Sequence, residues 1–350
     1  MTTTNFTDES YPKAVLENQH HSYHSTDPID PVIEPIISQF DQMMRYYVFF
    51  NLFFIVLGCL EFVLLVIFFT FLMQSAVLAL SLAVVFLTFF SYFILRLYFQ
   101  TRKAEQFLEI KDRYVTACRA ILHYQEDNPE DNIALSNACT KFADSLRGKE
   151  YQFYYPPHWL KSLHSSLREF SYWCHWGDVH RMRELLMSSA VEENIRLVKC
   201  EPTNLEAHAA LANAYVMLSS LYADPFVNQG KRSWFSNDKL IQSLEQKFRT
   251  TAERAIEEFK ILNDFAPHDP WVHIQLAYSY HDLKMPLEEI REYETIISLS
   301  PEDTDALFKL GKLYFEQGQN ASGLRIYEQL KHSEPEMADK LINCYGAYQN

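Results

Sequence analysis

The sequence predicts an all-α protein in which a two-helix transmembrane hairpin is followed by a cytosolic α-solenoid with insertions. Three observations support this fold class: the C-terminal part repeats every 34 residues, two long apolar runs lie near the N-terminus, and the 350 residues include only eight glycines. The apolar content of 48% allows a large core, and the length favours more than one domain. We expect four segments in chain order: 1–44, 45–99, 100–203 and 204–350.

Residues 1–44 are predicted to form a disordered polar tail. Four prolines interrupt this segment: Pro12, Pro28, Pro31 and Pro35. Its apolar residues are too few and too irregularly spaced to hold a core. The histidines at 20–24 lack supporting cysteine or carboxylate geometry, so a polar tail is favoured over a metal site. The first apolar run also begins too late for an ordinary secretory signal peptide.

Residues 46–72 and 76–95 are the two apolar runs, and each reaches the ~20 residues that a helix needs to cross a bilayer. Only three residues separate them, which predicts a tight hairpin with both chain ends on the same side. Basic residues flank the hairpin on that side: Arg45, Arg96, Arg102, Lys103, Lys111 and Arg113. Because basic flanks mark the cytoplasmic side, we expect an integral membrane protein with two spans and cytoplasmic N- and C-termini.

Glu61 lies near the middle of the first span, where a charged carboxylate is costly and often functional. Counting from the turn places Thr88 at about the same depth. One interpretation is a proton or ion relay, or a polar lock between the hairpins of an oligomer. The other is a protonated Glu61 that bonds to Thr88 or Ser91. We favour the second interpretation, because a single hairpin encloses no pathway unless it assembles.

The region 100–203 is predicted to be membrane-proximal and helical, with degenerate repeats. A helical period from Phe107 to Ile121 indicates that the second span continues out of the bilayer as a helix. Farther on, residues 174–180 contain Cys174, His175, Asp178 and His180, but their spacing fits no metal-ligand or nucleophile pattern. The aromatic residues around them are expected to pack between this region and the solenoid, or to dock at the bilayer surface: Tyr154, Tyr155, Trp159, Trp173 and Trp176.

The repeats occupy residues 204–350. Pro267, Pro301 and Pro335 are spaced 34 residues apart, and pairs of leucines and tyrosines keep the same interval. Two amphipathic helical patterns per unit predict stacked helix hairpins. The unit before Pro267 is about twice as long, which places an insertion near 219–246. A surface loop is expected there, with partner binding as the alternative. Residues 337–350 are expected to form a C-terminal capping helix.

The last unit closely resembles the tetratricopeptide repeat (TPR) family, on the residues Leu307, Leu310, Gly311, Tyr314, Gly318, Gly323, Tyr327 and Leu330. This resemblance implies that the small residues lie where helices cross closely. Glu289 stands where a small residue is expected, which implies a looser crossing. The resemblance also implies a partner-binding groove lined by first-helix residues: Asn213, Met217, Trp271, Ile274, Tyr278, His281, Phe308, Lys312 and Phe315. Since this set is mostly apolar and aromatic, we expect an amphipathic helix of another protein as the ligand.

The predicted function is a membrane-anchored TPR scaffold without catalysis, cofactor or metal. The formal charge of −14 argues against nucleic acid, and six scattered cysteines suit a reducing compartment. We find no phosphate-binding loop, HExxH, GxSxG or dinucleotide motif. An enzyme using the 174–180 cluster is the least favoured hypothesis.

The main alternative is an oligomeric membrane-assembly protein in which the hairpin itself carries the function, so a homo-oligomer stays open. The closely spaced spans resemble, in composition only, the bilobed hairpin of chlamydial inclusion-membrane proteins. That resemblance would imply an inclusion-membrane or secretion-associated protein of an intracellular bacterium.

Overall fold

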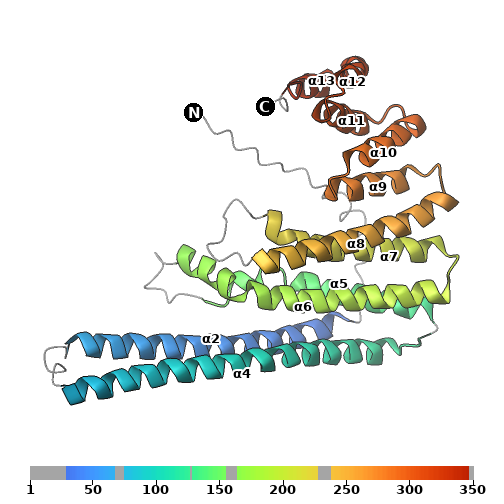
Figure 1. The fold of residues 1–350 in the computed structure, drawn as a ribbon. Helices are drawn as coiled ribbons and strands as arrows, with labels where there is room; N and C mark the ends of the chain where they lie inside the picture. The colour runs from blue at the N-terminus through green and yellow to red at the C-terminus, as the bar shows by residue number, and fades with distance from the viewer. Residues whose placement is uncertain (1–28, 68–74, 127, 155–163, 228–237, 347–350) are drawn as a thin grey trace.

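The computed structural model describes residues 29–67, 75–126, 128–154, 164–227 and 238–346. Across these ranges the chain forms eleven α-helices and one short 3-10 helix, and no strand. Two long helices lie side by side at one edge of the molecule, and the remaining helices stack away from them layer by layer (Figure 1). The fold is therefore all-α, with two long apolar helices followed by a solenoid of helix pairs.

Helices α2 (Asp30–Ile67) and α4 (Ser75–Leu122) form the antiparallel pair at that edge. Both are long and apolar enough to cross a membrane, with mean hydropathy of 2.6 and 2.4 over their most apolar stretches, none of which is buried. The other halves of the same two helices pack together. Phe40 of α2 is fully buried, and its ring lies 6.0 Å from that of Phe107 on α4. Each helix is thus exposed and apolar at one end and part of a core at the other.

The expected tail at 1–44 is wrong for its last part, because α2 begins at Asp30. Residues 1–28 lie outside the described residues. Buried side chains recur every three or four residues along the start of α2: Ile33, Ile36, Phe40, Met44 and Tyr47. This spacing forms one apolar stripe that faces α4. The prolines suggested a break, but Pro31 occupies the first turn of α2, where a proline is tolerated, and the helix accommodates Pro35 near its start.

Helices α5 (Pro129–Ser145) and α6 (His164–Cys200) form the next layer, with the short 3-10 helix η1 (Lys149–Tyr151) between them. Tyr114 of α4 packs on Phe142 of α5 with ring centroids 4.6 Å apart, and its hydroxyl donates to the Ala138 carbonyl at 2.8 Å. One apolar core extends from Ile29 in the N-terminal region to Tyr280 in the solenoid. The membrane-proximal region therefore shares its core with both neighbours.

The solenoid consists of α7 (Leu205–Val227), α8 (Asp238–Phe265), α9 (Pro270–Asp282), α10 (Pro286–Leu299), α11 (Thr304–Glu316), α12 (Asn320–Ser333) and α13 (Pro335–Ile342). The insertion expected as a loop near 219–246 mainly lengthens two helices, since α7 and α8 have 23 and 28 residues against 13 and 14 in α9 and α10. Trp234 and Phe235 lie outside the described residues. A second core begins at Ala277 and ends at Leu341.

Two glycines mark the close crossings of the last hairpin. A Cβ on Gly311 would lie 2.6 Å from the Leu341 side chain of α13, and a Cβ on Gly323 would lie 2.5 Å from the Phe315 ring. One unit earlier, Glu289 and His281 stand at the places of Gly323 and Phe315. Glu289 is buried and bonds to His281 Nδ1 at 3.1 Å. A buried carboxylate therefore occupies the crossing that was expected to be looser, and it bonds to an imidazole that is largely exposed.

Candidate functional site

Helix α9 is the first helix of its hairpin, and one face of it carries a row of partly exposed apolar residues. Asp269 caps this helix by accepting a hydrogen bond from the Trp271 amide at 2.9 Å, which fixes the first turn. The Trp271 side chain is 38% exposed and meets the Phe259 ring of α8 edge-on at 6.0 Å. Ile274 and Tyr278 are half-buried and follow on the same helix face at helical spacing.

Helix α11 extends this surface. Phe308 is half-buried against the second core, as is Ile274 of α9. The Lys309 ammonium donates to the Tyr278 hydroxyl at 2.9 Å and lies 4.7 Å from the centre of its ring, so it joins the two first helices. The sequence analysis did not predict Lys309 as a site residue. It directly follows Phe308, so both residues lie at the same height along α11. We call Trp271, Ile274, Tyr278 and Phe308 the aromatic strip.

Phe315, predicted to line the groove, is instead a core residue. Its ring is buried, packs against Gly323, and meets Tyr345 edge-on at a centroid distance of 5.4 Å. The C-terminal segment after α13 folds back over this end of α11 and supplies that contact. Lys312, one turn before the buried ring, is half-buried and lies 3.9 Å from Glu316 on the same helix.

The other predicted groove residues are His281, one turn after Tyr278 on α9, and two residues of the preceding hairpin. His281 ends α9, with its side chain 68% exposed, and the hydrogen bond with Glu289 raises the pKa of its imidazole despite some burial. Asn213 and Met217 are half-buried on α7, in the preceding hairpin, where Met217 packs against the first core. The continuous part of the predicted groove is therefore the α9–α11 strip.

Two buried histidines that the sequence analysis did not single out repeat one geometry. His208 of α7 places Nδ1 2.6 Å from Glu258 and Nε2 3.0 Å from the Pro202 carbonyl. His273 of α9 does the same with Glu292 at 2.7 Å and the Pro267 carbonyl at 3.1 Å. Each histidine thus ties its own hairpin together and holds it to the end of the preceding helix.

We call each of these arrangements a histidine clamp. Because a carbonyl and a carboxylate both accept, both ring nitrogens can donate only in the imidazolium form. Burial alone would lower the pKa of His208, but its bonds to Glu258 and Pro202 outweigh burial and raise it. A sequence signal existed, since each histidine follows a proline by six residues.

Glu61 and Thr88 face each other within the apolar part of the hairpin. The Thr88 hydroxyl donates to the Glu61 carboxyl at 2.6 Å. This bond joins α2 to α4 at the depth expected from counting residues. The carboxyl therefore has a partner inside one chain, whichever of the two interpretations of Glu61 applies.

The 174–180 cluster forms a joint between α4 and α6. Asp178 accepts hydrogen bonds from Lys103 at 2.8 Å and from His175 Nδ1 at 3.2 Å. Burial raises the pKa of the Cys174 thiol, which disfavours the reactive thiolate. Within the residues described, no three histidine, cysteine or acidic side chains are grouped so as to hold a metal ion.

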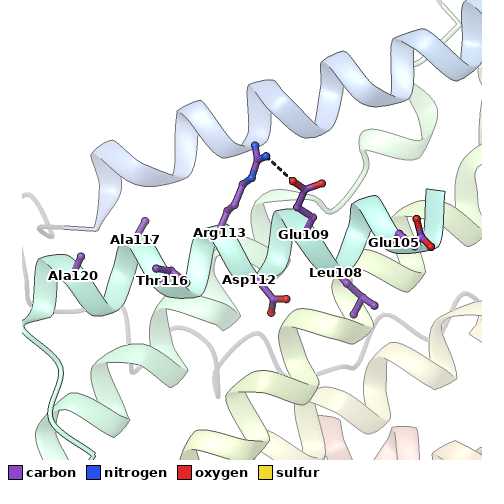
Figure 2. A pocket seen from close by; sticks show the side chains of 8 residues that line it. All are labelled: Glu105, Leu108, Glu109, Asp112, Arg113, Thr116, Ala117 and Ala120. Carbon is purple, nitrogen blue, oxygen red and sulfur yellow. Dashed lines mark hydrogen bonds and ion pairs between the residues drawn. The ribbon is translucent and has the colours of Figure 1, made fainter. Parts of the chain in front are cut away.

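A surface hollow of about 710 Å³ lies on the outer face of α4 (Figure 2). Its lining comes from one helix: Glu105, Leu108, Glu109, Asp112, Arg113, Thr116, Ala117 and Ala120. Arg113 pairs with Glu109 at 2.6 Å, leaving Glu105 and Asp112 as further acids in the lining. The hollow contains none of the predicted site residues.

Comparisons with known proteins give only distant likenesses. No protein-family model matches the sequence, and neither does any curated protein. Among solved structures, TTC0263, a thermophilic TPR protein of Thermus thermophilus, aligns at 14% identity and a TM-score of 0.33 over 70% of this chain and 95% of its own. A monomeric IFIT1 mutant with Gppp-AAAA aligns at 13% identity and a TM-score of 0.34 over 67% of this chain and 58% of its own. Scores this low carry no conclusion about ligand or partner.

Proposed function

We propose that the chain is a membrane-anchored helical-repeat scaffold that binds a protein partner on the aromatic strip and performs no catalysis. The observation that carries this proposal is the strip itself. It places an exposed tryptophan and three half-buried apolar side chains along two adjoining first helices, with Lys309 beside them. Aromatic anchors surrounded by partly covered apolar side chains are typical of the energetic centres of protein interfaces.

The proposed ligand is one face of an amphipathic helix. Residues on one face of α9 are separated by three or four positions, so a ligand helix with apolar residues at the same spacing can lie across them. Lys309 at the edge offers a positive charge to an acidic residue of the ligand. This chemistry does not select a nucleic acid, because the strip itself has no basic residue, Lys309 lies beside it, and the whole chain has a net charge of −14.

The proposed anchor is the exposed half of the α2–α4 hairpin. Each helix has an apolar stretch of about twenty residues that is mostly exposed, and at 1.5 Å per residue it spans about 30 Å, the thickness of a bilayer core. We propose two membrane spans with both chain ends on the cytoplasmic side, which suits the basic residues next to the spans.

The test is a pair of matched variants of the full chain in lipid nanodiscs. Partners crosslinked to the native chain are identified by mass spectrometry, purified and titrated against each variant. Trp271→Ala with Phe308→Ala should weaken Kd by roughly thirtyfold or more, since interface hot spots contribute about 2 kcal/mol or more. Leu287→Ala removes an exposed apolar side chain from the second helix α10 and should leave Kd unchanged. Equal affinities for both variants would exclude the strip.

A further inference from the structure

The start of α6 lies beside the membrane half of the hairpin. Lys103 of α4 meets Asp178 of α6 at 2.8 Å, and Lys103 lies five residues after Tyr98, the last exposed aromatic residue of α4. The residues of α6 that precede Asp178 therefore lie toward the apolar half of the hairpin. In Figure 1, α6 begins at the end of the layer nearer the α2–α4 turn.

Tyr154, in the segment before α6, lies at the same height along the hairpin as the start of α6. Burial raises the pKa of its hydroxyl to about 12, and the polar side chain of Asn51 of α2 partly offsets this rise. Asn51 in turn accepts from Tyr92 of α4 at 3.4 Å, and Arg96 donates to the same Tyr92 hydroxyl at 2.9 Å. This polar layer lies near the boundary between the exposed part of the hairpin and its packed part. A layer of tyrosine, asparagine and arginine is what a bilayer interface favours.

Aromatic side chains at the start of α6 extend outward from this layer. Trp173 is 53% exposed and Phe170 is 37% exposed, with ring centroids 6.0 Å apart. Tyr154 packs on Phe170 at 5.1 Å. Phe170 precedes Cys174 by four residues, so it lies about 6 Å farther toward the hairpin turn. Arg168, also near the start of α6, lies over the Tyr151 ring at 5.0 Å.

We propose that Tyr154, Phe170 and Trp173 form a third membrane contact, inserted at the boundary between lipid headgroups and acyl chains beside the hairpin. The inference rests on the proposed anchoring and adds an orientation to it. The occupant is lipid because this edge continues the exposed apolar surface of α2 and α4 at the level of Asn51 and Tyr92. A partner protein at this edge would have to displace lipid that already surrounds the hairpin.

The consequence concerns the solenoid. Helices α5, α6, α7 and α8 lie roughly along the direction of α4 (Figure 1). With the hairpin upright in the bilayer and the start of α6 at its surface, helices α5 to α8 point away from the membrane, and successive hairpins stack side by side. The chain then holds the solenoid in one orientation relative to the bilayer and does not let it swing on a flexible tether.

The test uses a photoreactive benzoylphenylalanine at single positions of the full chain, reconstituted in phosphatidylcholine vesicles whose lipid carries a clickable tag. Position 173 is the test site. Position 86 replaces Phe86, which is 68% exposed in the middle of the second span, and position 271 replaces the exposed Trp271 far along the solenoid. All three native side chains are exposed aromatics, so none of the substitutions disturbs a core. The readout is lipid-tagged protein after illumination.

Strong lipid labelling at 173 and 86, severalfold above that at 271, is the expected result. Labelling at 86 with none above background at 173 overturns the membrane contact and leaves the anchoring intact. A shift of the 173 product to the mass of a protein dimer also overturns it, in favour of contact with a second copy. Absence of labelling at 86 overturns the proposed anchoring and the inference together.

Discussion

The histidine clamp at His273 can be tested by exchanging it for the apolar pair that the next repeat uses. Leu307 and Ile326 stand 34 residues after His273 and Glu292, and both are buried. We therefore compare His273→Leu, Glu292→Ile and the double variant. The double variant gives this hairpin the apolar pair that already occupies the equivalent positions of the next hairpin.

The expected energies follow from burial. His273→Leu alone leaves the Glu292 carboxylate, only 19% exposed, without its partner, which costs about 1–3 kcal/mol. The double variant loses the bond to the Pro267 carbonyl, about 1 kcal/mol, but removes the polar pair and adds apolar burial of about 1.5–3 kcal/mol per fully buried side chain. Replacement of a buried ion pair by apolar residues is often neutral or stabilising. The double variant should thus be at least as stable as the native chain.

The assay is hydrogen exchange of α9 and α10 amides in the full chain, read by mass spectrometry, because local opening reports local stability. A loss of about 2 kcal/mol in His273→Leu speeds exchange roughly thirtyfold. His332→Leu with Glu328→Ile, at exposed positions of α12, is the matched control and should change nothing. The reasoning would be refuted if the free-energy losses of the two single variants simply added in the double variant, so that its amides exchanged faster than those of either single variant.

Three further predictions follow from the same contacts. The His208 clamp should stabilise α7 and α8 fully below about pH 6.5, the pKa of histidine in the unfolded chain. It should lose that contribution as pH rises through the raised pKa of the folded chain. Hydrogen exchange of these helices should therefore accelerate from pH 6 to pH 8 in the native chain, and the acceleration should be smaller in His208→Leu. Gly323→Ala places a Cβ against the Phe315 ring and should destabilise the last hairpin by about 1–3 kcal/mol in thermal unfolding, with Phe315→Leu in the same chain restoring part of the loss. Glu61→Gln keeps an acceptor for Thr88 and should leave oligomeric state unchanged by native mass spectrometry, whereas a changed state would favour the assembly function.

The sequence predicted those parts of the fold whose signals are local or periodic. Tyr280 and Tyr314 keep the 34-residue interval because each fills the same gap in successive hairpins, and both are buried. Glu61 and Thr88 could be paired by counting from a short turn, since two helices of equal rise run back from it. Regular geometry makes such distances predictable.

The errors occurred where burial depends on residues far apart in sequence. Phe40 looked like part of a tail because prolines precede it, and its partner Phe107 lies beyond both apolar runs. Phe315 matched a groove position, but Tyr345 covers it after the chain turns back. The histidine clamps escaped notice because one acceptor of each is a backbone carbonyl, which no residue type reveals.

Helix α4 has a mechanical consequence. Its 48 residues contain neither glycine nor proline, and at 1.5 Å per residue they make an unbroken rod of about 72 Å. One end is lipid-exposed in the proposed anchoring, and the other carries Tyr114, which packs in the core shared with α5. In the proposed anchoring, a change in bilayer thickness that tilts the apolar end of α4 would therefore tilt the repeats with it, because the rod has no glycine or proline at which to bend.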